Sequence, residues 1–258
     1  MLLVVDVGNS HMVLGLYDGE ELRGRWRVVT ANYRTGDELQ ILLYMLMQAA
    51  GIDRKSIFGC CAASVVPQLN TALEQVCQAT FGFSPLLVEP GVRTGLVLQC
   101  DNPKEVGADR IVNAVGAIAE YKGALIVVDF GTATTFDAVT ARGEWRGGVI
   151  VPGVQLAADA LFEHCAKLPR VEIRTPATVI GRDTVTNITS GLTYGYADMV
   201  DGLAPPLAAE MDDQPTVVAT GGFSQTIAEV SSEIGVVDPL LTLKGLRAVF
   251  LRNRGETP

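Results

Sequence analysis

The feature that most constrains this chain is a short pattern that occurs twice, about half the 258-residue length apart. In each copy, an apolar run leads to an Asp, then to any residue and a Gly, and small hydroxyl or amide residues follow. The two copies are Leu3 to Ser10 (LVVDVGNS) and Ile126 to Ala133 (IVVDFGTA). Self-similarity of this kind indicates a duplicated structural unit, so the two halves should share a fold.

Further strand-like stretches follow each copy of the repeat. Met12 to Tyr17 and Arg23 to Val29 follow the first, and Thr134 to Val139 and Trp145 to Val151 follow the second. Turn-forming residues separate the stretches in both halves. Each half is therefore expected to begin with a three-stranded antiparallel meander.

Helical and strand patterns alternate in the rest of each half, which predicts an α/β protein. Proline and glycine cluster between Glu89 and Gly107, so we expect two domains spanning residues 1–105 and 106–258. The pair Pro205-Pro206 is expected to interrupt the helix that contains it. The expected helices are Asp37–Ala50, Gln68–Thr80, Ala108–Tyr121, Val154–Lys167, Asn187–Met211 and Leu243–Leu251.

The charge balance excludes several classes of partner. With 20 basic and 29 acidic side chains, the net charge is −9, which gives no general attraction to nucleic acid or anionic lipid. No apolar run approaches the roughly 20 residues that span a bilayer. The start of the chain has no basic leader and reaches Asp6 at once, unlike a signal peptide. We expect a cytoplasmic protein that binds neither nucleic acid nor membrane.

The cysteines fit a reducing compartment. There are five, an odd number, with no CxxC spacing, and Cys60 and Cys61 are adjacent. We expect buried, reduced thiols, with zinc binding or redox chemistry as the alternative.

The first copy of the repeat has the composition of a phosphate-binding turn. Gly8 permits close backbone approach to a ligand, and Asn9 and Ser10 add side-chain donors to the backbone N–H groups of the turn. Asp6 ends an apolar strand beside them. Because Mg²⁺ binds one or two carboxylates together with phosphate oxygens, Asp6 is expected on the Mg²⁺ side of a bound nucleotide.

The second copy offers a similar set of phosphate-binding groups, in Gly131, Thr132, Thr134 and Thr135. Two such hairpins facing each other would hold a triphosphate between the domains. The alternative is that each Asp and Gly only satisfies turn geometry. A third glycine-rich turn, Thr220 to Ser224, is expected to accommodate adenine or ribose, or to be an ordinary strand-to-helix turn. Neither a P-loop nor a Rossmann fingerprint is present.

Four segments together resemble the type III pantothenate kinase family. They are Asp6 to Ser10, Asn102 to Arg110, Asp129 to Thr135 and Gly147 to Gly153. The resemblance runs from Met1 to beyond Gly222. It implies two duplicated ribonuclease-H-like domains with an interdomain ATP cleft, as in the actin-like ATPase superfamily.

The resemblance also implies an activity. The γ-phosphoryl group of ATP is transferred to the 4′-hydroxyl of pantothenate, which makes 4′-phosphopantothenate in the first step of coenzyme A synthesis. The family requires Mg²⁺ and a monovalent cation, K⁺ or NH₄⁺. It is homodimeric, with pantothenate bound near the dimer interface.

Site residues follow from the resemblance position by position. Asp129 is implied as the K⁺ ligand, and Asp109 is expected to accept or orient the proton of the pantothenate hydroxyl. Arg110 is expected to contact the pantothenate carboxylate or the transferring phosphoryl group. The expected ATP contacts are Asp6, Val7, Gly8, Asn9, Ser10, His11 and Thr132. His11 is included because it directly follows the first turn, and the alternative is that it is a simple strand residue. The implied pantothenate contacts are Gly107, Ala108, Asp109, Arg110 and Thr184, with Thr184 supplied by the partner subunit.

Two positions depart from the family pattern. Ser10 replaces the usual Thr and keeps its hydroxyl. Cys100 replaces a Tyr that contacts pantothenate in many members. Two other functions remain open: a phosphatase or polyphosphatase of the same superfamily, and an ATP-sensing regulator without catalysis. The Gly107 to Arg110 segment disfavours the phosphatase, because hydrolysis needs no site for an alcohol acceptor.

Overall fold

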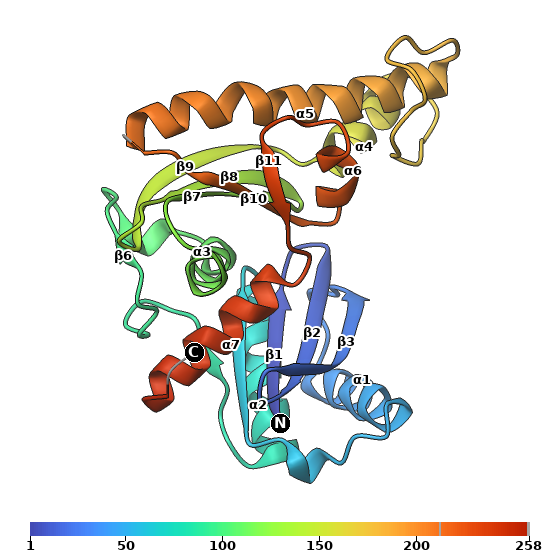
Figure 1. Cartoon of the computed structure of the whole chain (residues 1–258). Helices are drawn as coiled ribbons and strands as arrows, with labels where there is room; N and C mark the ends of the chain where they lie inside the picture. The colour runs from blue at the N-terminus through green and yellow to red at the C-terminus, as the bar shows by residue number, and fades with distance from the viewer. Residues whose placement is uncertain (212, 257–258) are drawn as a thin grey trace. The chain divides into compact units, whose positions relative to one another are not determined.

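The computed structural model describes residues 1–211 and 213–256 (Figure 1). Its contacts divide the chain into two compact units. The first comprises Met1–Gly95, Lys104–Ala119 and the residues from Thr242 onward, and the second comprises Leu96–Pro103 and Glu120–Leu241. The first unit therefore includes two segments from later in the sequence, Lys104–Ala119 and the residues from Thr242 onward. The division into domains 1–105 and 106–258 stays a prediction.

The first unit contains a five-stranded sheet in the order β3-β2-β1-β4-β5. The first three strands pair antiparallel, which confirms the meander, and β4 runs parallel to β1. The strands are β1 (Leu2–Val7), β2 (His11–Asp18), β3 (Glu21–Val29), β4 (Gly59–Ser64) and β5 (Leu86–Leu87). The helices of this unit are α1 (Gly36–Ala49), α2 (Pro67–Phe81), α3 (Ala108–Glu120) and α7 (Leu241–Arg254), with short 3₁₀ turns at Arg54–Ser56 and Pro103–Glu105.

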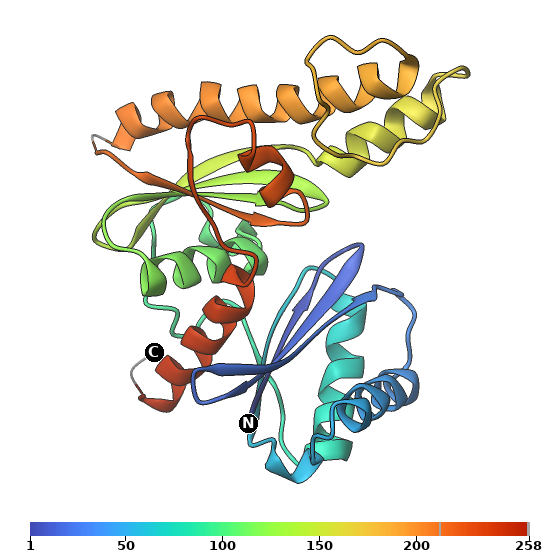
Figure 2. The same cartoon turned by 45° about the vertical axis from the view of Figure 1, so that its right-hand side comes forward.

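Helices cover both faces of this sheet, which explains why the first four residues of β1, Leu2 to Val5, form an unbroken apolar run. Leu3, Val5 and Val7 point into a core with α1 and α2. On the other face, α7 lies so close that a Cβ added at Gly59 would come within 2.2 Å of the Phe250 ring. Figure 2 shows α1 and α2 on the side of the sheet away from α7.

The second unit contains a six-stranded sheet in the order β11-β10-β7-β8-β9-β6. Its central meander repeats that of the first unit, and β10 and β11 run parallel to β7. The strands are β6 (Val97–Leu98), β7 (Leu125–Phe130), β8 (Ala133–Val139), β9 (Glu144–Pro152), β10 (Thr216–Gly221) and β11 (Ile234–Val237). The sequence patterns predicted neither β6 nor β11.

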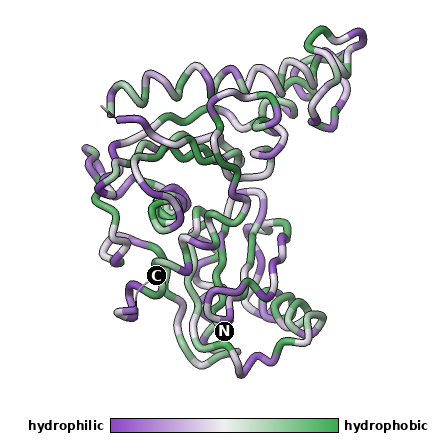
Figure 3. Tube along the Cα trace, viewed as in Figure 1, coloured by the Kyte–Doolittle hydropathy of each residue, from purple (hydrophilic) through white to green (hydrophobic). Residues whose placement is uncertain are grey.

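Three helices pack on one face of the second sheet: α4 (Val154–His164), α5 (Thr184–Met211) and α6 (Ser224–Ala228). Figure 2 shows them on that side, and Figure 3 shows apolar residues concentrated along the strands of both sheets. Ile126, Val128 and Phe130 of β7 face these helices. Among the described residues, no helix combines the length and apolar character that crossing a bilayer requires.

The expected break in α5 at Pro205-Pro206 is wrong, because the helix is continuous from Thr184 to Met211. The two prolines are exposed, while Ala197, Val200 and Ala204 of the same helix are buried in the core. Burial of this face outweighs the two helical hydrogen bonds that the prolines cannot donate.

Asp201 anchors α5 to the loop before β11. Its two carboxylate oxygens accept hydrogen bonds from the Ser231 hydroxyl at 2.5 Å, the Ser232 N–H at 2.8 Å, the Ser232 hydroxyl at 2.7 Å and the Glu233 N–H at 3.1 Å. Burial alone would raise the pKa of Asp201, but these four hydrogen bonds outweigh it and the pKa is lowered.

We therefore expect Asp201→Asn to lower the free energy of unfolding by about 1–3 kcal/mol at neutral pH. The lowered pKa means that the ionised carboxylate stabilises the fold above the unfolded pKa of about 3.9 and stops doing so as the pH falls through the folded value. Urea unfolding across an acidic pH series measures this difference. A wild-type advantage that persists after Asp201 is protonated would contradict the argument.

Candidate active site

The first repeat forms the turn between β1 and β2, in the first unit. Asp6 is the second-to-last residue of β1 and is half-buried, and Gly8, Asn9 and Ser10 form the turn, with Asn9 and Ser10 exposed. The Gly8 N–H donates to the His11 carbonyl at 3.0 Å. Val7 is a core residue, so only its backbone is available to a ligand.

His11 opens β2 and presents a defined tautomer. Its Nδ1 lies 3.0 Å from Nη2 of Arg27, and because a guanidinium only donates, Nδ1 is the acceptor and Nε2 carries the proton. Burial and, second, the positive charge of Arg27 lower the pKa of His11. At neutral pH this side chain is therefore a neutral imidazole whose Nε2–H is suited to donate to a phosphate oxygen.

A threonine that the sequence analysis did not select ties this turn to the loop after β3. The Thr30 hydroxyl donates to the Gly8 carbonyl at 2.7 Å, and the Thr30 N–H donates to the Ser10 carbonyl at 3.0 Å. These two hydrogen bonds join the backbone of the β1–β2 turn to the residue that follows β3. Thr30 directly follows β3 and belongs to no recognisable motif, so only the tertiary structure shows the contact.

The second repeat forms the matching turn between β7 and β8, in the second unit. Asp129 is again the second-to-last residue of its strand, but this turn has two residues, Gly131 and Thr132, instead of three. The Gly153 N–H donates to the Thr132 carbonyl at 3.1 Å. A Cβ at Gly153 would lie 2.3 Å from that oxygen, so the segment after β9 packs directly against the turn.

Asp129 lies among oxygen-bearing neighbours. Thr135 of β8 and Thr220 of β10 are its partners across the sheet. Gly221 adopts a φ of +89°, and a Cβ there would come within 2.5 Å of the Asp129 Oδ1. The Thr135 Oγ1 is buried and has no hydrogen-bond partner among the described residues. Carboxylate and hydroxyl oxygens suit a hard cation, so these residues fit a monovalent ion.

Thr134 does not belong to this set, which corrects the expectation that it helps to bind phosphate. It is fully buried, and strand alternation places it on the opposite face of β8 from Thr135. Its hydroxyl also has no hydrogen-bond partner among the described residues. Thr134 thus cannot contact a ligand on the Asp129 face.

Asp109 lies in the first turn of α3, in the first unit. Its Oδ1 accepts the Arg110 N–H at 2.8 Å, and its Oδ2 has no partner among the described residues. A Cβ at Gly107 would lie 2.5 Å from Oδ1, so the glycine leaves room for the carboxylate to fold back over the start of the helix. This geometry leaves one carboxylate oxygen for a substrate hydroxyl. Gly107, Ala108 and Arg110 are half-buried beside it.

Thr184 is the first residue of α5 and is exposed. The helix cap is made by its neighbour: Oδ1 of Asp183 accepts the Thr186 N–H at 2.8 Å, and bonds from Thr186 lower the pKa of Asp183. The Thr184 hydroxyl is therefore not needed for capping. It borders a cavity of about 580 Å³ whose other lining residues are Leu161, Leu168, Asn187, Ile188, Gly191 and Leu192.

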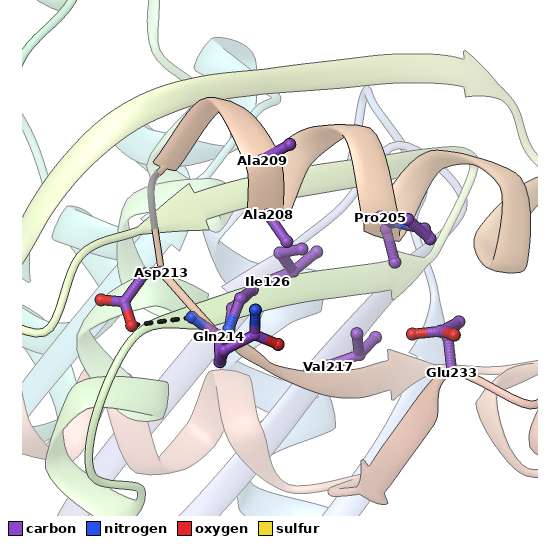
Figure 4. A pocket seen from close by; sticks show the side chains of 10 residues that line it. Ile126, Pro205, Ala208, Ala209, Asp213, Gln214, Val217 and Glu233 are labelled. Atoms are coloured by element: carbon purple, nitrogen blue, oxygen red, sulfur yellow. Dashed lines mark hydrogen bonds between the residues drawn. The ribbon is translucent and has the colours of Figure 1, made fainter.

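A second cavity, of about 660 Å³, lies under the C-terminal part of α5 (Figure 4). Asp213 and Glu233 lie at its two ends, and the Gln214 N–H donates to Asp213 at 2.8 Å. None of the predicted site residues borders it. Its lining residues are Ile126, Ala204, Pro205, Ala208, Ala209, Asp213, Gln214, Pro215, Val217 and Glu233.

Burial limits the reactivity of three of the five cysteines. All five are free thiols, and Cys60, Cys61 and Cys77 are buried. Burial raises the pKa of Cys61 to about 12, so its reactive thiolate is scarce at neutral pH. In the part of the chain that the structure describes, no three His, Cys, Asp or Glu side chains gather as a metal-binding cluster.

Solved structures of low sequence identity share the fold. Component A of (R)-2-hydroxyglutaryl-CoA dehydratase from Acidaminococcus fermentans superposes with a TM-score of 0.54 at 15% identity, covering 98% of both chains. A ROK hexokinase from Thermus thermophilus superposes with a TM-score of 0.51 at 14% identity, covering 97% of this chain and 99% of the hexokinase. These likenesses confirm the predicted fold, an α/β protein with two duplicated ribonuclease-H-like halves.

Close relatives specify the family. The family model for type III pantothenate kinase matches residues 2–205. The chain is 49% identical to the type III pantothenate kinase of Syntrophotalea carbinolica over 99% of its length and 100% of that protein. It is 52% identical to that of Anaeromyxobacter sp. strain Fw109-5 over 98% of its length and 100% of that protein. With Asp6, Asp109 and Asp129 all present, the chain belongs to the type III pantothenate kinase family.

Proposed function

We propose that this chain transfers the γ-phosphoryl group of ATP to the 4′-hydroxyl of pantothenate, the first step of coenzyme A synthesis. Family membership already makes it a kinase whose acceptor is an alcohol. The observation that carries the finer proposal is the roughly half-identical match along the whole chain to proteins named for this substrate.

ATP is proposed to bind through both repeat turns. The contacts come from Asp6, Val7, Gly8, Asn9, Ser10 and His11 in the first turn and from Thr132 in the second. Backbone N–H groups, the Asn9 and Ser10 side chains and the Nε2–H of His11 are donors for phosphate oxygens. Gly222, which has open space around its Cα, is available for the adenine or ribose.

Asp109 is proposed to accept the proton of the pantothenate hydroxyl on its unpartnered Oδ2. Arg110 is proposed to contact the pantothenate carboxylate or the transferring phosphoryl group, since a planar guanidinium forms paired bonds with either anion. Gly107 and Ala108 bring the substrate close to the start of α3. Transfer then depends mainly on how well these groups position the hydroxyl against the γ-phosphate.

Two cations complete the proposal. Asp6 would hold Mg²⁺ together with phosphate oxygens, and Asp129 with Thr135 would hold K⁺ or NH₄⁺. When bound, the cations neutralise the negative charge of the phosphates. The residues around Asp129 fit this role because they supply oxygen donors, one of them a buried hydroxyl without a partner.

We further propose a homodimer in the cytoplasm, in which Thr184 of one copy reaches pantothenate bound by the other. Exposed apolar side chains on α4 and around the start of α5 support a dimer surface, because exposed apolar side chains that gather on a surface commonly mark interfaces. They are Leu156, Phe162, Val179, Ile180 and Val185, with Ile180 81% exposed.

Release of ADP, measured with and without pantothenate at high K⁺, tests the proposed function. A kinase releases ADP only when pantothenate is present. A phosphatase of the same superfamily releases it at the same rate without pantothenate, and a regulator releases none. Either of the last two results would reject the proposal.

The cation role of Thr135 is tested by a matched pair of variants. Thr135→Val should raise the K⁺ concentration that gives half-maximal rate by about 10-fold, because one oxygen ligand is lost. It should also reduce the rise in melting temperature that K⁺ produces over Na⁺. Thr134→Val removes an equally buried hydroxyl on the other face and should change neither. Equal effects of the two variants would exclude a specific role for Thr135.

A further inference from the structure

Arg34 is a half-buried cation with one guanidinium nitrogen that has no partner in the part of the chain that the structure describes. It lies in the loop between β3 and α1 and is half-buried, with its Nη1 shielded from solvent. Within the described residues, its side chain makes no hydrogen bond, and no ion pair joins it to Asp37 or Glu38, the acidic residues nearest in sequence. Leaving a buried donor unsatisfied destabilises the fold, and more so when the group is charged. The fold therefore keeps one shielded guanidinium N–H group at this point without an acceptor from the described part of the protein.

The loop that carries Arg34 is fixed at both ends. At its start, Thr30 bonds to the Gly8 and Ser10 carbonyls of the first phosphate turn, at 2.7 and 3.0 Å. At its end, a Cβ at Gly36 would lie 2.8 Å from the Gln75 side chain of α2. The loop thus connects the phosphate turn directly to the helix layer.

The middle of the loop is folded back on itself. The Arg34 N–H donates to the Ala31 carbonyl at 2.9 Å. In a turn of this kind, the first and fourth Cα atoms lie within about 7 Å. Arg34 therefore starts close to Thr30, the residue that holds the first phosphate turn, and a long side chain is well suited to reach that turn.

We propose that Arg34 binds a phosphoryl group at the first turn, as an additional anion-binding residue. The missing partner is then an anionic oxygen of the ligand. Arginine suits this role because its planar fork of donors matches phosphate geometry and is always charged. Two ligands offer this chemistry, the polyphosphate chain of the nucleotide and the phosphate of the product. The inference rests on the proposed function only for the identity of these ligands.

Binding measured by titration calorimetry tests the inference, with a non-hydrolysable ATP analogue, 4′-phosphopantothenate, inorganic tripolyphosphate and pantothenate as separate probes. Arg34→Met keeps the length of the side chain and removes its charge. It should weaken at least one phosphate-bearing probe by about 10- to 100-fold, since hydrogen bonds to charged groups contribute about 1.5–3 kcal/mol. The probe that loses affinity identifies the phosphate source. Arg34→Lys should give an intermediate loss, and pantothenate itself should bind as before.

The stability of the ligand-free protein separates a binding role from a structural one. Arg34→Met removes a buried, unpartnered donor, so its urea midpoint should equal or exceed that of the wild type. Arg54→Met, at an exposed arginine of the same unit, is the matched control and should change neither stability nor binding. A lowered midpoint with unchanged affinity for every phosphate probe would overturn the inference, as would loss of pantothenate binding alone. The two claims can also fail separately. If the protein binds tripolyphosphate through Arg34 but does not phosphorylate pantothenate, the proposed function is rejected and the inference is kept.

Discussion

Replacement of Asp109 by Asn is expected to lower kcat by about 10²- to 10⁴-fold, the usual effect of removing a general base. Asparagine keeps the oxygen that accepts the Arg110 N–H at 2.8 Å, so the start of α3 should be preserved. What is lost is the second oxygen, which is available to take the hydroxyl proton. Steady-state kinetics with both substrates measures the effect.

The matched control for this variant is Asp198→Asn, an exposed carboxylate on α5. It carries the same chemical change at a position that is not among the predicted site residues, and it should leave kcat unaltered. Circular dichroism should show that both variants fold as the wild type does. A folded Asp109→Asn enzyme with near-normal turnover would remove Asp109 from the mechanism.

Gly153→Ala is expected to lower kcat/KM for ATP on the order of 100-fold, the effect that a misplacement of about 1 Å has on catalysis. The added Cβ would lie 2.3 Å from the Thr132 carbonyl oxygen and 2.5 Å from that of Gly131, far inside contact distance. The backbone of Gly153, with a φ of −72°, suits alanine, so the effect is steric and not conformational. The turn between β7 and β8 must therefore move.

Gly195→Ala is the control for this prediction. Gly195 is exposed in the middle of α5, and a Cβ there meets nothing within 4 Å. Alanine should stabilise the helix by up to about 1 kcal/mol and leave kinetics unchanged. Gly153→Ala should also unfold at lower urea concentration, because strain of this kind costs about 1–3 kcal/mol. An unaltered kcat/KM for ATP would show that the second turn does not position the nucleotide.

The repeat predicted the centre of both sheets because a strand, an Asp, a Gly and a second strand leave few alternatives. Each Asp lies second to last in its strand, as the pattern implies. Local signals failed where distant packing decides the structure. The short strands β6 and β11 carry no pattern of their own, and α5 passes through Pro205 and Pro206 because its other face is buried.

The candidate site, like the fold, could be predicted from local sequence signals only in part. Motifs located Asp6, Asp109 and Asp129, since each lies in a segment of unusual composition. They did not separate Thr134 from Thr135, because only the register of β8 against β7 shows which hydroxyl shares a face with Asp129. Thr30 and Arg34 lie outside every motif. Their significance depends on hydrogen bonds and burial that arise only when the chain is folded.

The most direct test of the central claim is to identify the products formed from ATP and pantothenate by mass spectrometry and ³¹P NMR. We predict one 4′-phosphopantothenate for each ADP, with both absent from reactions that lack pantothenate. Formation of ADP and inorganic phosphate in equal amounts, with pantothenate recovered unchanged, would contradict the claim.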